Sequence, residues 1–220
     1  MKTSFLNKLL ITALALLVWN CSQKNSQENS YLSLPILGNR HVEEIERDGK
    51  KVQDTVYHKI ADFSFTNQEG KEVNNLSVKG KVYVADFFFT SCPTICPVMK
   101  TQMLRVYERF KDQPDFLILS HTLDPTHDTP ELLKDFAHKI GVENDQTWHF
   151  LTGDQEKIFE IGQTSYMTTA MSDQSEPGGY LHSGAFLLVD QDGHIRGVYD
   201  GTKEDQVDRL MNDIPKLLQK

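Results

Sequence analysis

The chain has 220 residues, with 23 Lys and Arg against 31 Asp and Glu, so its formal net charge is −8. This length allows a targeting segment and one catalytic or binding domain with a sizeable core. The acidic balance argues against nucleic acid as a partner, because phosphate backbones are bound through clustered positive charge.

Residues 1–20 predict a secretory signal. They hold two lysines, no acidic residue and an apolar stretch, Leu9 to Trp19, that is too short to span a bilayer comfortably. Cys21 follows, and its position predicts a lipid anchor after cleavage, although Trp19 and Asn20 replace the usual small residues. An unmodified cysteine near an ordinary signal is the alternative. We expect a signal peptide of lipoprotein type at 1–20, a polar tether at 21–33 and a domain at 34–220.

The first predicted elements of the domain are short β-strands. Arg40–Glu46 and residues 51–58 flank Asp48-Gly49, a pair typical of a two-residue β-hairpin turn. Residues 62–66 alternate apolar and polar side chains, and Gly70 provides the next turn. Val82 to Phe89 is an almost continuous apolar run, which predicts a buried strand.

Helices and strands alternate in the rest of the chain. Pro97 suits the first turn of a helix, because its missing N–H is not needed there. Thr129 and Pro130 begin a second helix as capping residue and first helical residue. The remaining expected elements are strands at 116–120, 148–151, 183–189 and 194–199, helices at 154–161 and 203–218, and a long polar loop from Thr164 to Gly179.

This order of elements predicts a mixed α/β fold. Crossover helices imply parallel central strands, and the closing hairpin implies antiparallel strands beside them. The predicted arrangement is thioredoxin-like, with a central mixed β-sheet, flanking helices and an added N-terminal β-hairpin. Open α/β sheets usually carry their sites at the carboxyl ends of strands, which places the expected site directly after Phe89.

Cys92 and Cys96 stand at that position. On a helix, residues four apart share one face, with Cβ atoms roughly 5–6 Å apart. The pair could hold one soft metal ion or close a disulfide, since exported thiols without protection tend to be oxidised. A helix N-terminus stabilises a thiolate, so we expect a lowered pKa for Cys92. Two thiolates favour Cu(I) or Zn(II), and one added imidazole favours copper.

His182 is the best third ligand among the eight histidines. It lies just before the terminal hairpin, at a position that faces the cysteine loop in thioredoxin-like folds. Without the two cysteines, an ordinary surface histidine would be the favoured interpretation. His121, which follows a buried strand, could also reach the site or bond to the backbone. The histidines expected to be structural or solvated are His127, His138, His149 and His194.

Three further features leave alternatives open. Met167 and Met171 could be auxiliary soft ligands or a contact surface for a partner, but filling an apolar gap is the favoured interpretation. Asp124 could orient the site or stabilise a turn. Asp86 stands within the buried strand, where a carboxylate needs a partner or acquires a raised pKa unless a sheet edge exposes it.

Four segments, in this order, together span nearly all of residues 60–200. They are Phe88–Pro97, Leu123-Asp124-Pro125 followed by Asp128-Thr129-Pro130, Trp148–Gly153, and His182-Ser183. With this set the chain resembles the Sco/SenC family, the copper-binding, thioredoxin-like accessory factors of cytochrome c oxidase assembly. An aspartate is frequent before the histidine in that family, whereas this chain has Leu181.

The resemblance implies that Cys92, Cys96 and His182 hold Cu(I) or Cu(II) and face the periplasm. It also implies a role in maturing the binuclear copper centre of oxidase subunit II, and reduction of the disulfide at that target. We expect the protein to be anchored in the membrane of the bacterial cell envelope through a lipid on Cys21. Other periplasmic copper carriers or thiol reductases are further expected partners.

A metallochaperone, which is not an enzyme, is the favoured function. The alternative is a membrane-tethered thiol-disulfide reductase in which Cys92 attacks and Cys96 resolves, because exchange needs only the two sulfur atoms. A peroxidase of the peroxiredoxin type is less favoured, since Phe89 stands where that family has a threonine.

Overall fold

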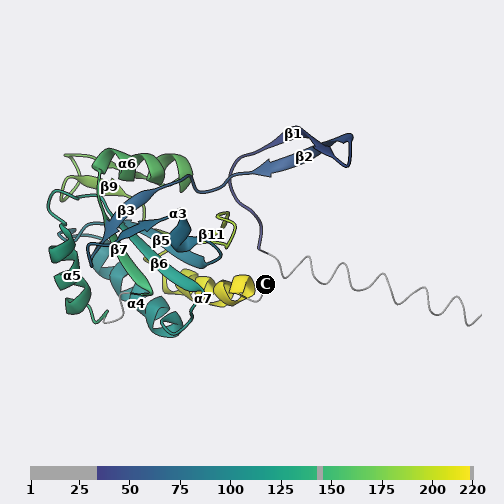
Figure 1. Cartoon of the computed structure of the whole chain (residues 1–220). Coiled ribbons are helices and arrows are strands. Elements are labelled where there is room, and N and C mark those ends of the chain that lie inside the picture. Colours follow the sequence, from purple (N-terminus) through teal and green to yellow (C-terminus); the bar gives the residue numbers. More distant parts are fainter. Residues whose placement is uncertain (1–33, 143–145, 219–220) are drawn as a thin grey trace, which may run out of the picture. The chain divides into compact units, whose positions relative to one another are not determined.

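The computed structural model describes residues 34–142 and 146–218 (Figure 1). The predicted signal peptide, Cys21 and the tether at 21–33 lie outside these residues. The chain from Pro35 onward forms one compact unit. Within the described part of the chain, no helix combines the length and the apolar character needed to cross a bilayer.

Helices and strands alternate broadly as the sequence predicts, and the mixed α/β fold with an N-terminal hairpin is confirmed. In chain order the elements are β1 Arg40–Arg47, β2 Lys50–Tyr57, β3 Ser64–Asn67, β4 Glu72–Asn74, α3 Asn75–Val78, β5 Val82–Phe88, α4 Cys96–Phe110, β6 Phe116–Thr122, α5 Pro130–Lys139, β7 Trp148–Thr152, α6 Gln155–Glu160, the π-helix η1 Ile161–Ser165, β8 Ala170–Ser172, β9 Tyr180–His182, β10 Ala185–Val189, β11 Ile195–Asp200 and α7 Glu204–Leu218.

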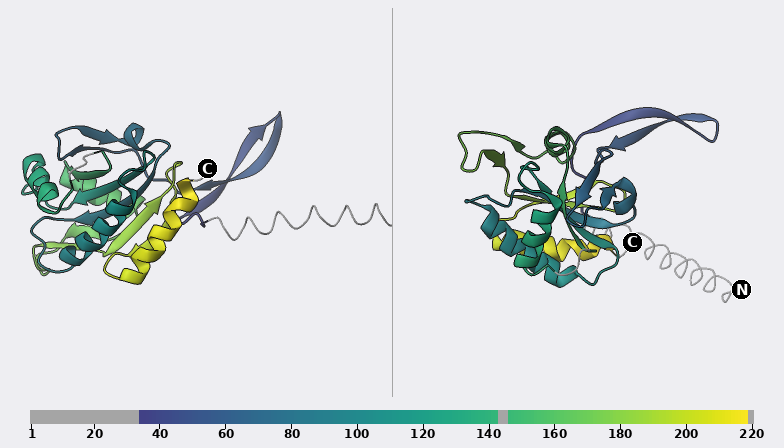
Figure 2. Two further views of the ribbon diagram at one scale, coloured as in Figure 1. Left: turned by 90° about the horizontal axis from the view of Figure 1, so that it is seen from below. Right: turned by 60° about the vertical axis from the view of Figure 1, so that its left-hand side comes forward.

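The central sheet has seven strands in the order β11-β10-β5-β6-β7-β3-β4. The middle strands β5, β6 and β7 are parallel, and antiparallel strands flank them on both sides. Helices α4 and α7 lie below the sheet and α6 lies above it (Figure 1), and Figure 2 shows the sheet and its helices from two further sides. Both faces of β5 and β6 are therefore covered, which explains why every residue of these two strands is buried.

The hairpin β1–β2 projects from the rest of the domain (Figure 1). Its turn residues Asp48 and Gly49 both have positive φ, 54° and 72°. That backbone is the type I′ turn for which the Asp-Gly pair is favoured, because its twist matches the twist of the two strands. The turn fixes the register in which Arg47 lies opposite Lys50.

The predicted loop from Thr164 to Gly179 was wrong in two places. The helical path of α6 continues as η1 to Ser165, and β8 pairs with β9 so that Ala170 lies opposite His182. Neither element shows a clear apolar period, because each is very short and β8 has only one buried residue, Ala170. The pairing matters because it holds the segment that carries His182.

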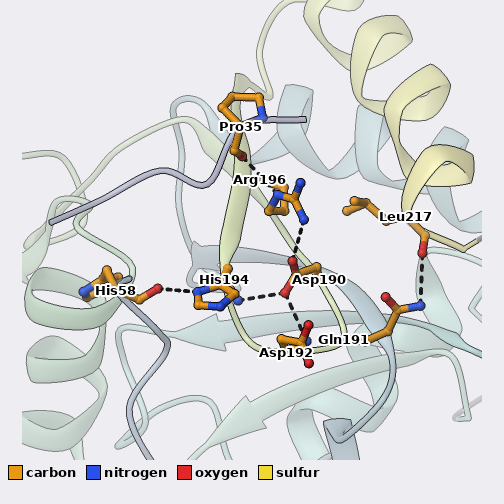
Figure 3. Close-up of polar contacts among 8 residues, drawn as sticks. All are labelled: Pro35, His58, Asp190, Gln191, Asp192, His194, Arg196 and Leu217. Carbon is orange, nitrogen blue, oxygen red and sulfur yellow. Dashed lines mark hydrogen bonds and ion pairs between the residues drawn. The ribbon is translucent and has the colours of Figure 1, made fainter. Parts of the chain in front are cut away.

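A polar network at the turn between β10 and β11 binds the chain segments that precede and follow the hairpin β1–β2 (Figure 3). The buried Arg196 guanidinium donates to the Asp190 carboxylate over 2.7 Å and to the Pro35 carbonyl over 3.0 Å. The other Asp190 oxygen accepts the backbone N–H groups of Asp192 and His194. The His194 ring bonds to the His58 carbonyl over 2.7 Å. The β10–β11 turn therefore holds the chain both before and after the hairpin β1–β2.

Candidate metal centre

The cysteine-bearing segment leads from the buried end of β5 to the start of α4. β5 ends at Phe88, and in the following turn the Cys92 N–H donates to the Phe89 carbonyl over 3.2 Å. Helix α4 then begins at Cys96. Cys92 therefore precedes the helix. The expectation that both cysteines share one helical face was wrong, since the turn brings them together instead.

The histidine-bearing segment is β9. His182 lies opposite Ala170 of β8, and its ring contacts the ring of Phe89 edge to face, with centroids 5.8 Å apart and an interplanar angle of 79°. Cys92 and His182 each have only 8% of their surface exposed. Because Phe89 begins the turn that holds Cys92, this ring contact places the imidazole against the cysteine-bearing segment.

The three predicted ligand atoms converge on one point. Nε2 of His182 lies 3.8 Å from Sγ of Cys92 and 3.4 Å from Sγ of Cys96, and all three donor atoms lie within 4.8 Å of one another. With bonds of about 2.3 Å to sulfur and about 2.0 Å to nitrogen, donors around one ion lie about 3.5–4 Å apart. The two nitrogen–sulfur distances match this spacing, so the three donors suit a single soft metal ion.

The three groups differ in their electrostatic surroundings. Burial raises the pKa of the Cys92 thiol, but hydrogen bonds from the Thr94 hydroxyl and backbone and from Cys96 outweigh burial, so that the net pKa is lowered. Burial raises the pKa of Cys96 far above its ordinary value and lowers the pKa of His182. Cys92 is thus the more easily deprotonated of the two thiols, and burial favours the neutral form of the His182 imidazole.

His121 lies in a different environment. It is fully buried and stacks on Phe87 with ring centroids 5.0 Å apart, and Tyr166 packs beside it. Neither ring nitrogen has a hydrogen-bond partner among the described residues. The backbone bond considered from sequence is therefore absent here, and burial lowers the pKa of the ring to about 3.

The two loop methionines do not fill an apolar gap, so the favoured interpretation of them was wrong. Met167 and Met171 are 42% and 44% exposed. Met171 lies opposite Leu181, and successive strand residues point to opposite sides, so its side chain points away from the side of β9 that carries His182. The methyl group of Met167 lies beside Gly38, on the segment before the hairpin.

Asp86 is buried rather than exposed at a sheet edge. It is 5% exposed and accepts a hydrogen bond of 2.5 Å from the Ser120 hydroxyl, which in turn accepts the Trp148 indole N–H. Burial raises the pKa of Asp86 to about 7, and the Ser120 bond opposes the shift. A small cavity of about 20 Å³ is lined by both Asp86 and Cys96.

The remaining histidines lie away from the sulfur atoms. His127 and His138 are exposed, the ring of His149 contacts the Asn67 amide, and His194 belongs to the turn network of Figure 3. Among the residues that the structure describes, the Cys92, Cys96 and His182 group is the one cluster of His, Cys, Asp and Glu side chains with metal-ligand spacing.

A family model described as SCO1/SenC matches residues 51–219. The chain belongs to this family. A SCO1/SenC family lipoprotein from Bacillus anthracis is 32% identical in sequence, and its structure superposes with a TM-score of 0.67 over 74% of this chain and 96% of that chain. The thioredoxin-like prediction of the fold is thereby confirmed.

Two other SCO1/SenC structures resemble this chain. BsSco, described as a member of the Sco family of cytochrome c oxidase assembly proteins with a disulfide switch, is 34% identical and has a TM-score of 0.65 over 74% of this chain and 94% of its own. ScoI of Bradyrhizobium japonicum, solved with copper bound, is 25% identical with a TM-score of 0.56 over 71% of this chain and 98% of its own.

Proposed function

We propose that this SCO1/SenC protein is a copper metallochaperone that binds one copper ion through Cys92, Cys96 and His182. The convergence of two sulfur atoms and one ring nitrogen within 4.8 Å carries the proposal. A thiolate-rich set with one imidazole and few ligands is the kind of site that copper prefers over harder metals. The copper-bound relative from Bradyrhizobium japonicum supports the same choice of metal.

The proposed acceptor is the binuclear copper centre of cytochrome c oxidase subunit II. Assembly of that oxidase is the role given for the relative BsSco. Copper would move by ligand exchange, in which a thiolate of the acceptor replaces one protein donor at a time, so that the ion is never released into water. We place the protein in the bacterial cell envelope, facing the periplasm and held to the membrane by a lipid on Cys21.

A second function, thiol-disulfide reduction, is favoured by the asymmetry of the cysteine pair. The pKa of Cys92 is lowered whereas that of Cys96 is raised by burial. The Cys92 thiolate would attack a disulfide of the acceptor and release one acceptor thiolate. Cys96 would then lose its proton and attack Cys92, which frees the second acceptor thiol and leaves a Cys92–Cys96 disulfide. A periplasmic thiol reductase must supply the two electrons that restore the pair.

Copper titration of the full-length protein, with a competing chelator, tests the metallochaperone proposal. We expect one copper per chain and intense sulfur-to-copper absorption in the wild type. Cys92→Ser, Cys96→Ser and His182→Ala should each weaken copper binding by about 100-fold or more, since loss of an outer partner of a metal ligand alone costs about 10–100-fold. Cys21→Ser and the exposed-histidine variant His138→Ala are the matched controls, and both should bind as the wild type does.

Disulfide exchange by the same variants separates the two functions. His182→Ala should keep its rate of disulfide reduction, whereas either cysteine variant should lose it. Unchanged copper affinity and absorption in His182→Ala would contradict the three-donor site and leave dithiol chemistry as the function.

A further inference from the structure

The loop between β6 and α5, residues 123–129, bonds to both segments that carry the proposed ligands. It contains two carboxylates, Asp124 and Asp128. One bonds to a residue two positions before Cys92, and the other to a residue two positions before His182. We call this loop the aspartate clamp.

Asp128 is hydrogen-bonded to the cysteine-bearing segment. Its side chain is fully buried, and it accepts the Thr90 hydroxyl over 2.5 Å and the Thr90 backbone N–H over 3.0 Å. A third hydrogen bond comes from the Thr122 hydroxyl at the end of β6. A buried carboxylate held by three donors has few alternative positions, so Thr90 is fixed in both its backbone and its side chain.

Asp124 is hydrogen-bonded to the histidine-bearing segment. Its carboxylate accepts the Tyr180 hydroxyl over 3.0 Å. Tyr180 is the first residue of β9, and its ring contacts Phe89 with centroids 5.2 Å apart. The same Phe89 ring contacts His182. The Asp124 bond therefore holds the end of β9 against the aromatic ring at the start of the cysteine-bearing segment.

The two halves of the aspartate clamp are tied to each other. The backbone N–H of Asp128 donates to the Asp124 carbonyl over 2.8 Å, and the His127 N–H donates to the same carbonyl over 3.1 Å. The Thr122 hydroxyl, which donates to Asp128, also accepts the Asp124 N–H over 3.1 Å. A displacement of either carboxylate is thus transmitted to the other through one short turn.

We propose that the aspartate clamp sets the distance between the two sulfur atoms and the imidazole, with Asp124 and Asp128 as positioning residues that touch neither donor atoms nor metal. Without the clamp, the cysteine turn and β9 would each be held mainly by local contacts, and the site would have to be assembled when copper binds. The cost of that ordering would appear as a lower affinity. The copper readout rests on the proposed function.

Two substitutions each remove one hydroxyl that donates to the aspartate clamp, and both leave the two carboxylates in place. Thr90→Val should weaken copper binding about tenfold, because a hydrogen bond to a buried charged group is lost. Tyr180→Phe should weaken it about threefold, since its bond is partly exposed. Both should shift the sulfur-to-copper absorption band, and Thr90→Ser, which restores the hydroxyl, should recover wild-type affinity.

The chain offers matched controls for both substitutions. Thr147→Val removes a buried threonine hydroxyl that bonds to the Lys111 carbonyl, and Tyr199→Phe removes a tyrosine bond to the Asp213 carboxylate. Neither bond touches the clamp, so copper affinity and the absorption band should stay as in the wild type. Equal effects in the controls and the clamp variants, or no effect in Thr90→Val, would overturn the proposal.

Amide hydrogen exchange in the copper-free protein tests the clamp independently of metal. Exchange should quicken severalfold at residue 90 in Thr90→Val and at His182 in Tyr180→Phe, while the amides of β5 and β6 keep wild-type rates. A wild type that binds no copper would refute the proposed function without touching this result. Tight copper binding with unchanged exchange and affinity in both variants would refute the clamp alone.

Discussion

Buried ionisable groups have different partners at the two ends of the central sheet. Where β10 turns into β11, the carboxylate of Asp190 meets the guanidinium of Arg196 over 2.7 Å, with side chains only 2% and 7% exposed. Toward the end that carries the cysteines, Asp86 meets a serine hydroxyl and His121 is enclosed by aromatic rings. Opposite charges lie beside each other at the first end, whereas burial at the second end favours the uncharged forms of both groups.

This difference predicts where stability depends on pH. Asp86 has a folded pKa of about 7, above its ordinary value of 3.8, so its contribution to stability is lost as the pH rises toward and past 7. His121 has a folded pKa of about 3, below its ordinary 6.5, so its contribution is lost as the pH falls below 6.5.

Of the three substitutions that test this comparison, Arg196→Ala should change the free energy of unfolding most. Removing the guanidinium leaves a buried carboxylate without its cation and should lower the free energy of unfolding by about 3–5 kcal/mol. Urea unfolding at pH 7 measures the change. Arg105→Ala is the control, because it breaks a more exposed pair with Asp208 that should be worth about 0–1 kcal/mol. Equal losses in the two variants would show that burial of the pair at the turn carries no special weight.

Asp86→Asn should change stability in the opposite direction. The amide keeps the shape of the side chain and cannot ionise, so the variant should gain about 2–4 kcal/mol over the wild type at pH 8. The gain should shrink toward pH 5, where the wild-type carboxyl is protonated in the folded state. Thermal unfolding from pH 5 to pH 8 checks this trend, and a difference independent of pH would contradict the raised pKa of this carboxyl.

His121→Leu should have the smallest effect and the reverse pH trend. The wild type must keep this ring neutral while the unfolded chain binds a proton, so the variant should be about 2 kcal/mol more stable at pH 5. The advantage should largely disappear at pH 8, where the unfolded chain no longer binds that proton. A His121→Leu protein as acid-sensitive as the wild type would assign the acid response to another group.

Much of the fold was predictable because strong local signals mark its main elements. The Asp48-Gly49 turn, the apolar run of β5 and the capping residue Thr129 each determine a local structure without help from distant residues. The short strands β8 and β9 could not be predicted in this way. They exist because each supplies the backbone partners of the other, which is a tertiary relation that three residues of sequence do not reveal.

In the site, too, local signals predicted some features, whereas tertiary contacts that the sequence does not reveal decided others. The cysteine spacing and the position of His182 led to the three converging atoms, because the chemistry of a soft metal restricts the choice of residue types. The bonds that hold them were not foreseen. Asp124 could be read only as orienting the site or stabilising a turn, and Tyr180 stood out by no pattern, since a bond across 56 positions has no local signature.

The attachment of the N-terminal segment has a mechanical consequence. The Leu37 N–H bonds to the Ile195 carbonyl over 2.8 Å and the Pro35 carbonyl accepts from Arg196, so tension arriving from the N-terminus is taken up in shear along β11. Strand β10, the antiparallel neighbour of β11, begins just after His182 and ends at that point. A chain pulled from its N-terminus would therefore strain the sheet first at the corner where β11 begins, away from the sulfur atoms and the imidazole.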